Sequence, residues 1–283
     1  AALELPHMFP VFEINGLPSI ELPYRYPFLD KGTLEKIRKI EANCIKRCGK
    51  IIVPSWVIRD YLVGEGVSKG KITVITNGAS IPENVSEYPG LPEKYVLYFG
   101  ALQSWQGVHP LLKSFNYLQD IDDLFLVICS SQPEKQVRPY KKIVSRLKLE
   151  DKVAWRYQLG KDHLNSVIKQ ALCTVAPLSE CTRNIKQGCS PLKIFESLAN
   201  STPVIASDLP VVREIMNHGK EGLLVPPDRP ADLARAIRQM VEGTGEREEM
   251  GRRGLRLIQE HYQWKSKQQE LAVLYESCIG LMV

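Results

Sequence analysis

Short apolar runs alternate along the chain with stretches whose apolar residues recur at helical spacing. Eight runs of three to six residues have the apolar character of buried strands: 10–14, 50–53, 72–75, 96–99, 124–129, 153–155, 173–176 and 203–206. Between these runs, the segments 34–45 and 111–118 carry apolar residues at no more than five positions from one to the next, close to the period of an amphipathic helix. Strand then helix, repeated, requires parallel pairing with right-handed crossovers. The pattern therefore predicts a doubly wound α/β fold.

The segment 77–94, NGASIPENVSEYPGLPEK, interrupts this rhythm with three prolines, two glycines and no periodicity. Such a composition is typical of an interdomain linker. We therefore expect a partial N-terminal domain with its linker over 1–90, a full α/β domain over 91–262 and a last helix over 263–283. The first part has too few strands for a doubly wound sheet, so we interpret it as the back half of a domain.

Length and composition indicate a folded chain without a membrane span. The chain has 283 residues, of which 44% are apolar, and this excludes wholesale disorder. No apolar run approaches the roughly 20 residues that cross a bilayer, and the first residues lack the features of a signal peptide. Seven cysteines are spread over the chain, so we expect reduced thiols and a cytoplasmic location. Because the first residue is Ala, we expect the true amino terminus to lie further upstream.

The net charge of +5 is small and scattered, which argues against nucleic acid as a partner, because nucleic acid requires a concentrated basic stripe. A mild attraction to acidic membranes or anionic small molecules is allowed. Cys44 and Cys48 lie four residues apart on a predicted helix and favour helix packing over metal binding, since nothing nearby supplies two more ligands. One basic cluster is interpreted as a solvated helix face rather than a lipid contact: Arg138, Lys141, Lys142, Arg146 and Lys148.

Two strand–helix junctions carry candidate chemistry, because ligands of parallel α/β sheets bind at the carboxyl ends of strands. The first junction is the loop 100–107, in which Gly100 and Gly107 allow a ligand to approach the backbone. The alternative is a turn that merely needs glycine. The spacing is not the dinucleotide fingerprint, which argues against a dinucleotide-dependent oxidoreductase.

The second junction is the stretch 188–207. Ser190 suits a helix N-cap and Pro191 suits the first helical position. The free amides and the positive end of such a helix favour an anion. Lys193 and Glu196 follow three residues apart on one face. The alternative is a weak, solvated ion pair.

These residues resemble a known family. The run SPLKIFESLANSTPVIAS resembles the donor-site signature of family 4 glycosyltransferases, in the branch with a Ser-Pro-Leu-Lys-x-Phe-Glu core. The run YFGALQSWQGV is similar to the first donor-domain loop of that branch. The pieces KIIVPSWVIRDYL, KITVITNGA and EGLLVPPDRPADLARAI match family blocks in the same order. The resemblance extends from about residue 9 to residue 276.

The resemblance implies a GT-B enzyme with two Rossmann-like domains and an active site between them. Such an enzyme transfers a sugar from a nucleotide-diphosphate sugar to a glycan or lipid-linked acceptor, with retention of configuration. It needs no metal and no cofactor besides the nucleotide-sugar co-substrate. The donor binds the carboxyl-terminal domain. Peripheral association with the inner membrane face is left open. The family also has about 100 residues ahead of the position of residue 9, so part of the acceptor domain is expected to be missing.

Carried over to this chain, the resemblance assigns Lys193 and Glu196 to the catalytic site, with Lys193 at the diphosphate and Glu196 at the ribose. The amides of residues 190–193 would hold the diphosphate, and the loop 100–107 would cradle it from the other side. The loop 156–158 would frame the nucleobase. The donor-binding residues are then Gly100, Ala101, Gln106, Tyr157, Gly188, Cys189, Ser190, Pro191 and Leu192.

Several positions depart from the family pattern. Ala101 and Gln106 stand where many relatives have Arg and Lys, Gly188 where many have Glu, and Asn15 where an acceptor-side His is common. Arg183 and Lys186 lie in the segment 179–187, which is interpreted as a solvated loop rather than as compensation for the lost charge. A second hypothesis is therefore a degenerate or split glycosyltransferase module that binds a donor or a partner without turnover on its own.

Overall fold

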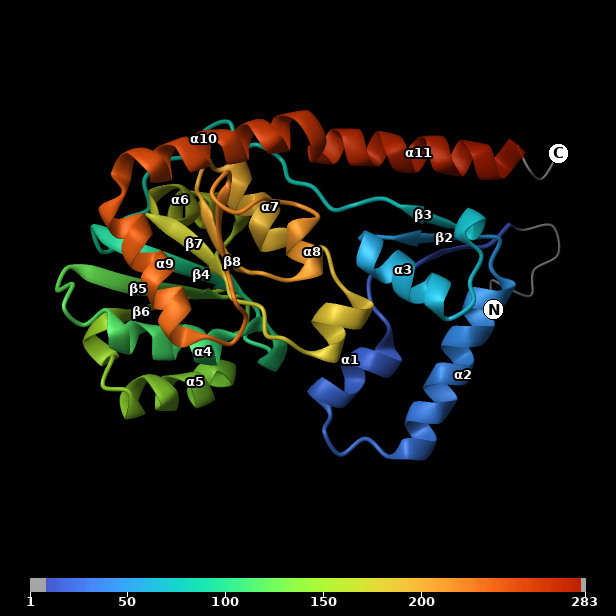
Figure 1. Ribbon diagram of the computed structural model, residues 1–283, viewed down its shortest axis with the longest axis horizontal. Helices are drawn as coiled ribbons and strands as arrows, with labels where there is room; N and C mark the ends of the chain where they lie inside the picture. The colour runs from blue at the N-terminus through green and yellow to red at the C-terminus, as the bar shows by residue number, and fades with distance from the viewer. Residues whose placement is uncertain (1–8, 281–283) are drawn as a thin grey trace.

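The computed structural model describes residues 9–280, and in them it places two parallel sheets (Figure 1). The smaller sheet has the order β1–β2–β3: β1 (Val11–Glu13), β2 (Lys50–Val53) and β3 (Ile72–Val74). The larger has the order β6–β5–β4–β7–β8–β9: β4 (Lys94–Gly100), β5 (Leu124–Ser130), β6 (Val153–Tyr157), β7 (Cys173–Ala176), β8 (Val204–Ser207) and β9 (Gly222–Val225). All neighbouring strands in both sheets run parallel, so the predicted α/β class is confirmed.

Each of the eight predicted apolar runs overlaps a strand, with ends that differ by no more than two residues. The strand β9 is absent from that prediction. Its sequence GLLV is short and lies between turn residues, so it gives little periodic signal. It adds to the sheet edge by pairing with β8 from Gly222 to Val225.

The larger sheet is buried on both faces, since successive residues of β4 enter different cores. Val96 and Tyr98 join the core beneath α4 (Val108–Ser114), α5 (Glu134–Arg146) and α9 (Pro230–Glu242). Tyr95 and Leu97 face α6 (Lys161–Gln170). On that second face, α7 (Leu192–Ala199) and α10 (Thr244–His261) pack over β7 and β8. The sheet and the helices on its two faces therefore form a three-layer unit of the doubly wound type.

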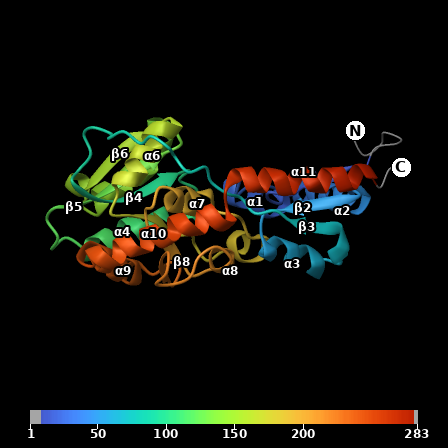
Figure 2. The same ribbon diagram turned by 90° about the horizontal axis from the view of Figure 1, so that it is seen from above.

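The smaller sheet is covered differently on its two faces. Residues of α1 (Pro18–Arg25) and α3 (Trp56–Gly64) cover one face around Ile51 and Val53. The last helix α11 (Trp264–Gly280) lies along the other face, where Leu274 and Cys278 pack on Ile52 (Figure 2). The chain therefore returns from the larger unit to complete the smaller one.

The helix α2 (Lys31–Arg47) contacts the core of the smaller sheet through the partly buried Ile45, and none of its residues is fully buried. A groove of about 710 Å³ separates it from α1 and α3. All residues that line this groove lie between Leu17 and Lys71, so the groove belongs to the smaller unit alone. Across residues 9–280, no helix combines the length and apolar character that crossing a membrane requires.

The segment between β3 and β4 has little regular structure, but hydrogen bonds fix it at Ala79. The Ala79 amide donates to the Tyr262 carbonyl at 2.8 Å, and the Trp264 amide donates to the Ala79 carbonyl at 3.2 Å. A Cβ on Gly78 would lie 2.4 Å from the Tyr262 oxygen, so only glycine allows this approach. The connecting segment is thus attached to the junction of α10 and α11.

Candidate donor-binding site

The order of strands in the larger sheet marks one place as a binding site. The chain builds outward from β4 to β6, then returns to the other side of β4 with β7. A crevice forms outside the carboxyl ends of strands where the order reverses in this way. The loop 100–107 follows β4, and the segment 177–191 follows β7. Both predicted junctions therefore lie at this reversal point.

The loop 100–107 is held in a form that requires glycine at both ends. Gly100 and Gly107 have φ values of +113° and +67°. A Cβ on Gly107 would lie 1.6 Å from the Pro177 carbonyl oxygen, so the loop passes directly against the strand-end segment after β7. The Tyr98 hydroxyl donates to the Ala101 carbonyl at 2.6 Å, which ties the loop to its own strand. These contacts give the loop a fixed course over the sheet.

The start of α7 differs from the prediction in its cap. The N-cap residue is Pro191 rather than Ser190, and no side chain caps the helix. The Ser190 hydroxyl instead accepts a hydrogen bond from the Asn77 amide at 3.2 Å, and the Asn77 side chain donates to the Ser190 carbonyl at 2.9 Å. The prediction was wrong because a sequence cannot show that a residue more than 100 positions away takes the hydroxyl. The first amides of α7 remain available to a ligand.

Gly188 begins the loop into α7 and has no space for a side chain. Its φ is +74°, and a Cβ would lie 2.8 Å from Val57 Cγ1 and 3.0 Å from Val211 Cγ1. Val57 belongs to α3 of the smaller unit, so this loop lies where the two units meet. A Glu at this position, as in many relatives, would not fit here without a shift of these neighbours.

Lys193 brings the two loops together. Its Nζ donates to the Gln106 side-chain oxygen at 2.7 Å and lies 4.1 Å from the centre of the Tyr98 ring. A Cβ on Gly100 would lie 3.9 Å from Lys193 Cε. Burial lowers the pKa of Lys193 to about 7, because no carboxylate close by outweighs the loss of water. The geometry thus places an amine, which becomes a cation when it takes up a proton, between the loop 100–107 and α7.

Glu196 lies one turn further along α7, as its spacing from Lys193 predicted. Burial raises the pKa of the Glu196 carboxyl, and the charges of Lys161 and Lys193 act against that rise. Lys161 is the first residue of α6, so the Glu196 side chain lies near the start of that helix. A half-buried carboxylate in that position can accept hydrogen bonds from hydroxyl groups.

Two predicted residues lie apart from this cluster. The Tyr157 ring stacks on Trp155 with centres 6.4 Å apart and lies beneath Lys141 of α5, so it packs on the α5 face of the sheet. The neighbouring Arg156 points to the other face and donates to the Gly90 carbonyl. A role of Tyr157 at the nucleobase stays a prediction.

Asn15 lies at the carboxyl end of β1 and donates to Glu13 at 2.9 Å. It lines a cavity of about 110 Å³ together with Thr76, Asn77 and Trp264. Since Asn77 also holds Ser190, Asn15 and the loop into α7 share one neighbour. An acceptor role for Asn15 stays a prediction.

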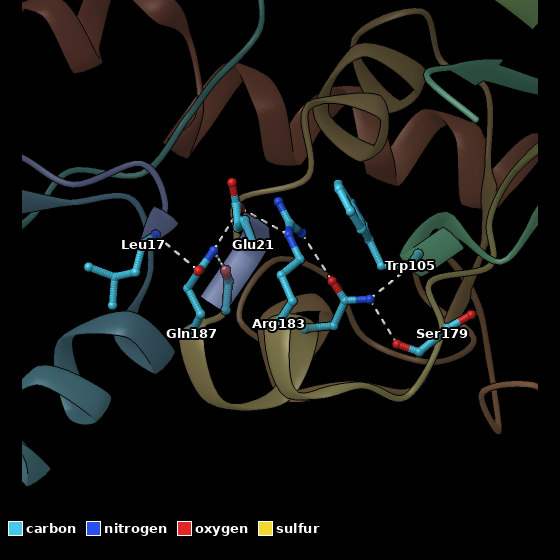
Figure 3. A network of polar contacts seen from close by, with 8 residues as sticks. Leu17, Glu21, Trp105, Ser179, Arg183 and Gln187 are labelled. Atoms are coloured by element: carbon cyan, nitrogen blue, oxygen red, sulfur yellow. Dashed lines mark hydrogen bonds and ion pairs between the residues drawn. The ribbon is translucent and has the colours of Figure 1, made fainter. Parts of the chain in front are cut away.

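The segment 179–187 is not the solvated loop that the sequence suggested. Residues Arg183–Gln187 form a π-helical turn, in which Asn184 and Gln187 have no exposed surface. The Arg183 side chain is 13% exposed, and its Nε donates to Glu21 of α1 at 3.1 Å (Figure 3). The interpretation was wrong because the polar side chains of this segment are used between the units. Lys186 remains exposed.

Cys189 lies near two basic side chains, those of Arg183 and Lys193. Burial raises the pKa of its thiol, while the charges of Arg183 and Lys193 act in the opposite direction. Within residues 9–280, no group of three or more His, Cys, Asp or Glu side chains is arranged to hold a metal ion. The independence from metal and from other cofactors stays a prediction.

A family model described as "Glycosyl transferases group 1" matches residues 80–256. The O-antigen chain mannosyltransferase RfbU of Salmonella typhimurium is 26% identical over 221 residues, which are 77% of this chain and 58% of that protein. The uncharacterized glycosyltransferase MJ1069 of Methanocaldococcus jannaschii is 19% identical over 83% of this chain and 60% of its own length. The chain thus spans less than two thirds of these curated relatives.

Solved structures share the fold over nearly the whole chain. Sucrose-phosphate synthase from Thermosynechococcus elongatus gives a TM-score of 0.78 at 22% identity, covering 96% of this chain and 68% of that one. Anabaena Alr3699/HepE in complex with UDP-glucose gives 0.77 at 17% identity, covering 95% and 72%. The architecture is therefore the GT-B type that the sequence predicted. With a family model that covers well over half of its residues, the chain belongs to the glycosyl transferases group 1 family.

Proposed function

We propose that this chain carries the donor site of a glycosyltransferase that moves a sugar from a nucleotide-diphosphate sugar to a glycan or lipid-linked acceptor, with retention at the anomeric carbon. The larger unit, residues 91–262, binds the donor. The smaller unit and α11 form part of the acceptor side. A role in polysaccharide biosynthesis agrees with the name of the O-antigen mannosyltransferase, and UDP-glucose is the ligand named for the HepE structure.

One observation carries this proposal, namely the position of Lys193. Its Nζ lies between the loop 100–107 and the uncapped start of α7. A diphosphate in the crevice would meet the first amides of α7, the positive end of the helix and this side chain together. Glu196 then lies one turn further along for the ribose hydroxyls.

The chemistry supports the same assignment. Transfer breaks the bond between the anomeric carbon and the distal phosphate oxygen, so negative charge develops on the diphosphate. Fixed amide dipoles and a cation beside that oxygen stabilise the transition state more than the ground state. The acceptor hydroxyl forms the new bond to the anomeric carbon, and its proton goes to the departing diphosphate. A crevice between two units also excludes water, which favours transfer over hydrolysis.

A second candidate is a module that binds the donor but does not turn it over alone. The observation in its favour is the neutral partner of Lys193, since Gln106 contributes an oxygen rather than a second charge. Ala101 adds no charge either. Hydrolysis or transfer of a nucleotide-diphosphate sugar by the isolated chain would exclude this candidate.

The proposal is tested by calorimetric titration of UDP, GDP and ADP into the chain and two variants. Lys193→Met keeps the length of the side chain without its charge, and Glu196→Gln keeps the shape of the carboxylate. We expect at least one nucleotide to bind the wild type, and each variant to bind it on the order of tenfold more weakly, as for a lost charge-assisted contact. Arg235→Gln, an exposed change on α9, serves as the control and should bind like the wild type. Absence of binding at millimolar concentration, or equal binding by all proteins, would refute the site.

A further inference from the structure

The polar contacts between α1 and the turn Arg183–Gln187 form a network that joins the two units (Figure 3). Glu21 Oε1 accepts from Arg183 Nε at 3.1 Å and from Gln187 Nε2 at 2.9 Å. Gln187 Oε1 in turn accepts from the Leu17 amide at 2.9 Å. One carboxylate of the smaller unit therefore satisfies two side chains of the larger one.

The Glu21 carboxylate lies close to the backbone of its own unit. A Cβ on Gly16 would lie 2.7 Å from Glu21 Oε1, so the carboxylate folds back over the glycine that precedes α1. Its side chain is 33% exposed, against 13% for Arg183. Since the partner groups are buried, loss of Glu21 would leave the Arg183 guanidinium without a carboxylate and reduce the Gln187 amide to its 3.5 Å hydrogen bond to the Gly188 carbonyl. The turn Arg183–Gln187 would then have to rearrange.

The network reaches the loop 100–107 on one side. Arg183 donates to Asn184 Oδ1 at 3.0 Å, and Asn184 Nδ2 donates to the Trp105 carbonyl at 2.9 Å. The Arg183 guanidinium also lies 5.2 Å from the centre of the Trp105 ring. Tyr24 of α1 meets that ring edge-on, with centres 6.0 Å apart. The smaller unit thus contacts the first donor loop through Trp105.

The network reaches the loop into α7 on the other side. Gly188 follows Gln187 directly, and a Cβ there would lie 2.8 Å from Val57 Cγ1 and 3.0 Å from Val211 Cγ1, so the backbone runs close against both side chains. The charge of Arg183 also acts against the rise in the pKa of the Cys189 thiol that burial causes, and Cys189 directly follows Gly188. A displacement at residue 187 would therefore pass to the amides at the start of α7.

We propose that Glu21 is a positioning residue for the donor site, which acts from the acceptor-side unit through Arg183 and Gln187. It sets the course of both loops that meet the diphosphate, so donor binding depends on the placement of the smaller unit. This inference rests on the proposed function, because it names the diphosphate as the group that the two loops hold.

The test compares UDP and UMP binding to the full chain and to Glu21→Ala, with Glu21→Gln as the conservative variant and Glu35→Ala as the control. Glu35 is an exposed carboxylate on α2 of the same unit. We expect Glu21→Ala to weaken UDP binding about fivefold or more, a usual size for coupling between sites. UMP binding should change less, because UMP lacks the second phosphate. Glu21→Gln keeps one acceptor oxygen and should recover part of the loss, while Glu35→Ala should bind as the wild type does.

Hydrogen exchange without nucleotide supplies a second readout. We expect peptides over residues 179–193 to exchange faster in Glu21→Ala than in the wild type, with peptides over α9 unchanged. In a double-mutant cycle with Gln187→Met, the two losses should not add, because both changes break one network. Unchanged exchange over 179–193 overturns the proposal whether or not nucleotide binds.

The remaining outcomes separate the two proposals. Equal UDP affinity of the wild type and Glu21→Ala overturns the role of Glu21 and leaves the proposed function standing. A parallel loss of UDP and UMP binding shows general damage to the site and also overturns it. A wild type that binds no nucleotide diphosphate at millimolar concentration overturns the proposed function and this inference with it.

Discussion

At the residue scale, the proposed donor site depends on a lysine in a nearly uncharged setting. Lys193 has the Gln106 oxygen and the Tyr98 ring as close partners, and burial lowers its pKa to about 7. A bound diphosphate favours the ammonium form. The residue is therefore expected to take up a proton when the donor binds.

We predict that UDP binding weakens as the pH rises above 7. The ammonium fraction of free Lys193 falls through its pKa of about 7, so the dissociation constant should rise by up to tenfold per pH unit between pH 7.5 and 9. The nucleotide itself stays fully ionised in that range, since its last phosphate pKa lies near 6. Titrations of the wild type and Lys193→Met measure this. The variant should show a flat profile, and a flat profile for the wild type would refute the assignment.

The same pKa predicts the opposite sign for stability of the free protein. The unfolded lysine has a pKa near its ordinary value of 10.5, above the folded value of about 7. Between these two values the unfolded chain binds the extra proton, so the free energy of unfolding should rise with pH. Lys193→Met should therefore be more stable than the wild type at pH 7, by about 1 kcal/mol or more, and this advantage should shrink toward pH 10. Urea unfolding of both proteins at several pH values measures this difference. A stability advantage of Lys193→Met that grows with pH would contradict the prediction.

Glycine positions give a third residue-scale prediction. Gly107 has a positive φ, and a Cβ there would lie 1.6 Å from the Pro177 oxygen. Gly107→Ala should lower the free energy of unfolding by roughly 3 kcal/mol or more, because strain and overlap add. Gly160→Ala is the matched control, since nothing lies within 4 Å of its added Cβ. Thermal unfolding of both variants decides this, and similar midpoints would contradict the described course of the loop.

At this scale the sequence predicts only part of the site. Lys193, Glu196 and the glycines could be identified, because local spacing and backbone freedom leave a signature along the chain. Glu21 could not be paired with Arg183, since 162 positions separate them. The same holds for Asn77 and Ser190. Contacts between units depend on how the units meet, and one sequence does not carry that information.

At the element scale, the strands were predictable because both faces of the larger sheet are buried, which produces continuous apolar runs. The course of α2 was not. Its apolar spacing predicts a packed helix, whereas the structure leaves it without buried residues and with Ile40 63% exposed. Periodicity identifies a helix face but not the surface that the face meets.

The helix α11 provides an element-scale prediction. Leu274 is 8% exposed and packs on Ile52 of β2, while its neighbour Val273 is 61% exposed. Leu274→Ala should cost about 2 kcal/mol or more of unfolding free energy, as for a truncated core residue. Val273→Ala should cost less than about 0.5 kcal/mol, as for a surface change. Chemical unfolding of both variants measures the difference, and equal costs would show that α11 does not cover the smaller sheet.

The contact between α3 and α8 (Pro210–Arg213) belongs to the same scale. The Glu214 carboxylate, just after α8, accepts from the amides of Trp56 at 3.0 Å and Val57 at 2.8 Å, at the start of α3. We expect Glu214→Ala to cost about 1 kcal/mol, as for the loss of a helix cap. Hydrogen exchange over residues 56–64 should rise. Unaltered exchange there would rule out Glu214 as a cap of α3.

At the scale of the whole molecule, several separate contacts connect the two sheets. The segment after β3 binds Ser190 through Asn77 and the end of α10 through Ala79. The units are therefore joined by α11, by this segment and by the Glu21 network. We propose that this arrangement holds the donor site ready for a sugar donor.

The central claim is that the diphosphate of a sugar donor binds between the loop 100–107 and the start of α7. A crystal structure of the chain soaked with UDP tests it most directly. Our account predicts the two phosphates within hydrogen-bond distance of the amides of Leu192 and Lys193, and the ribose at Glu196. Nucleotide in the groove between α1, α2 and α3, with the crevice empty, would contradict it.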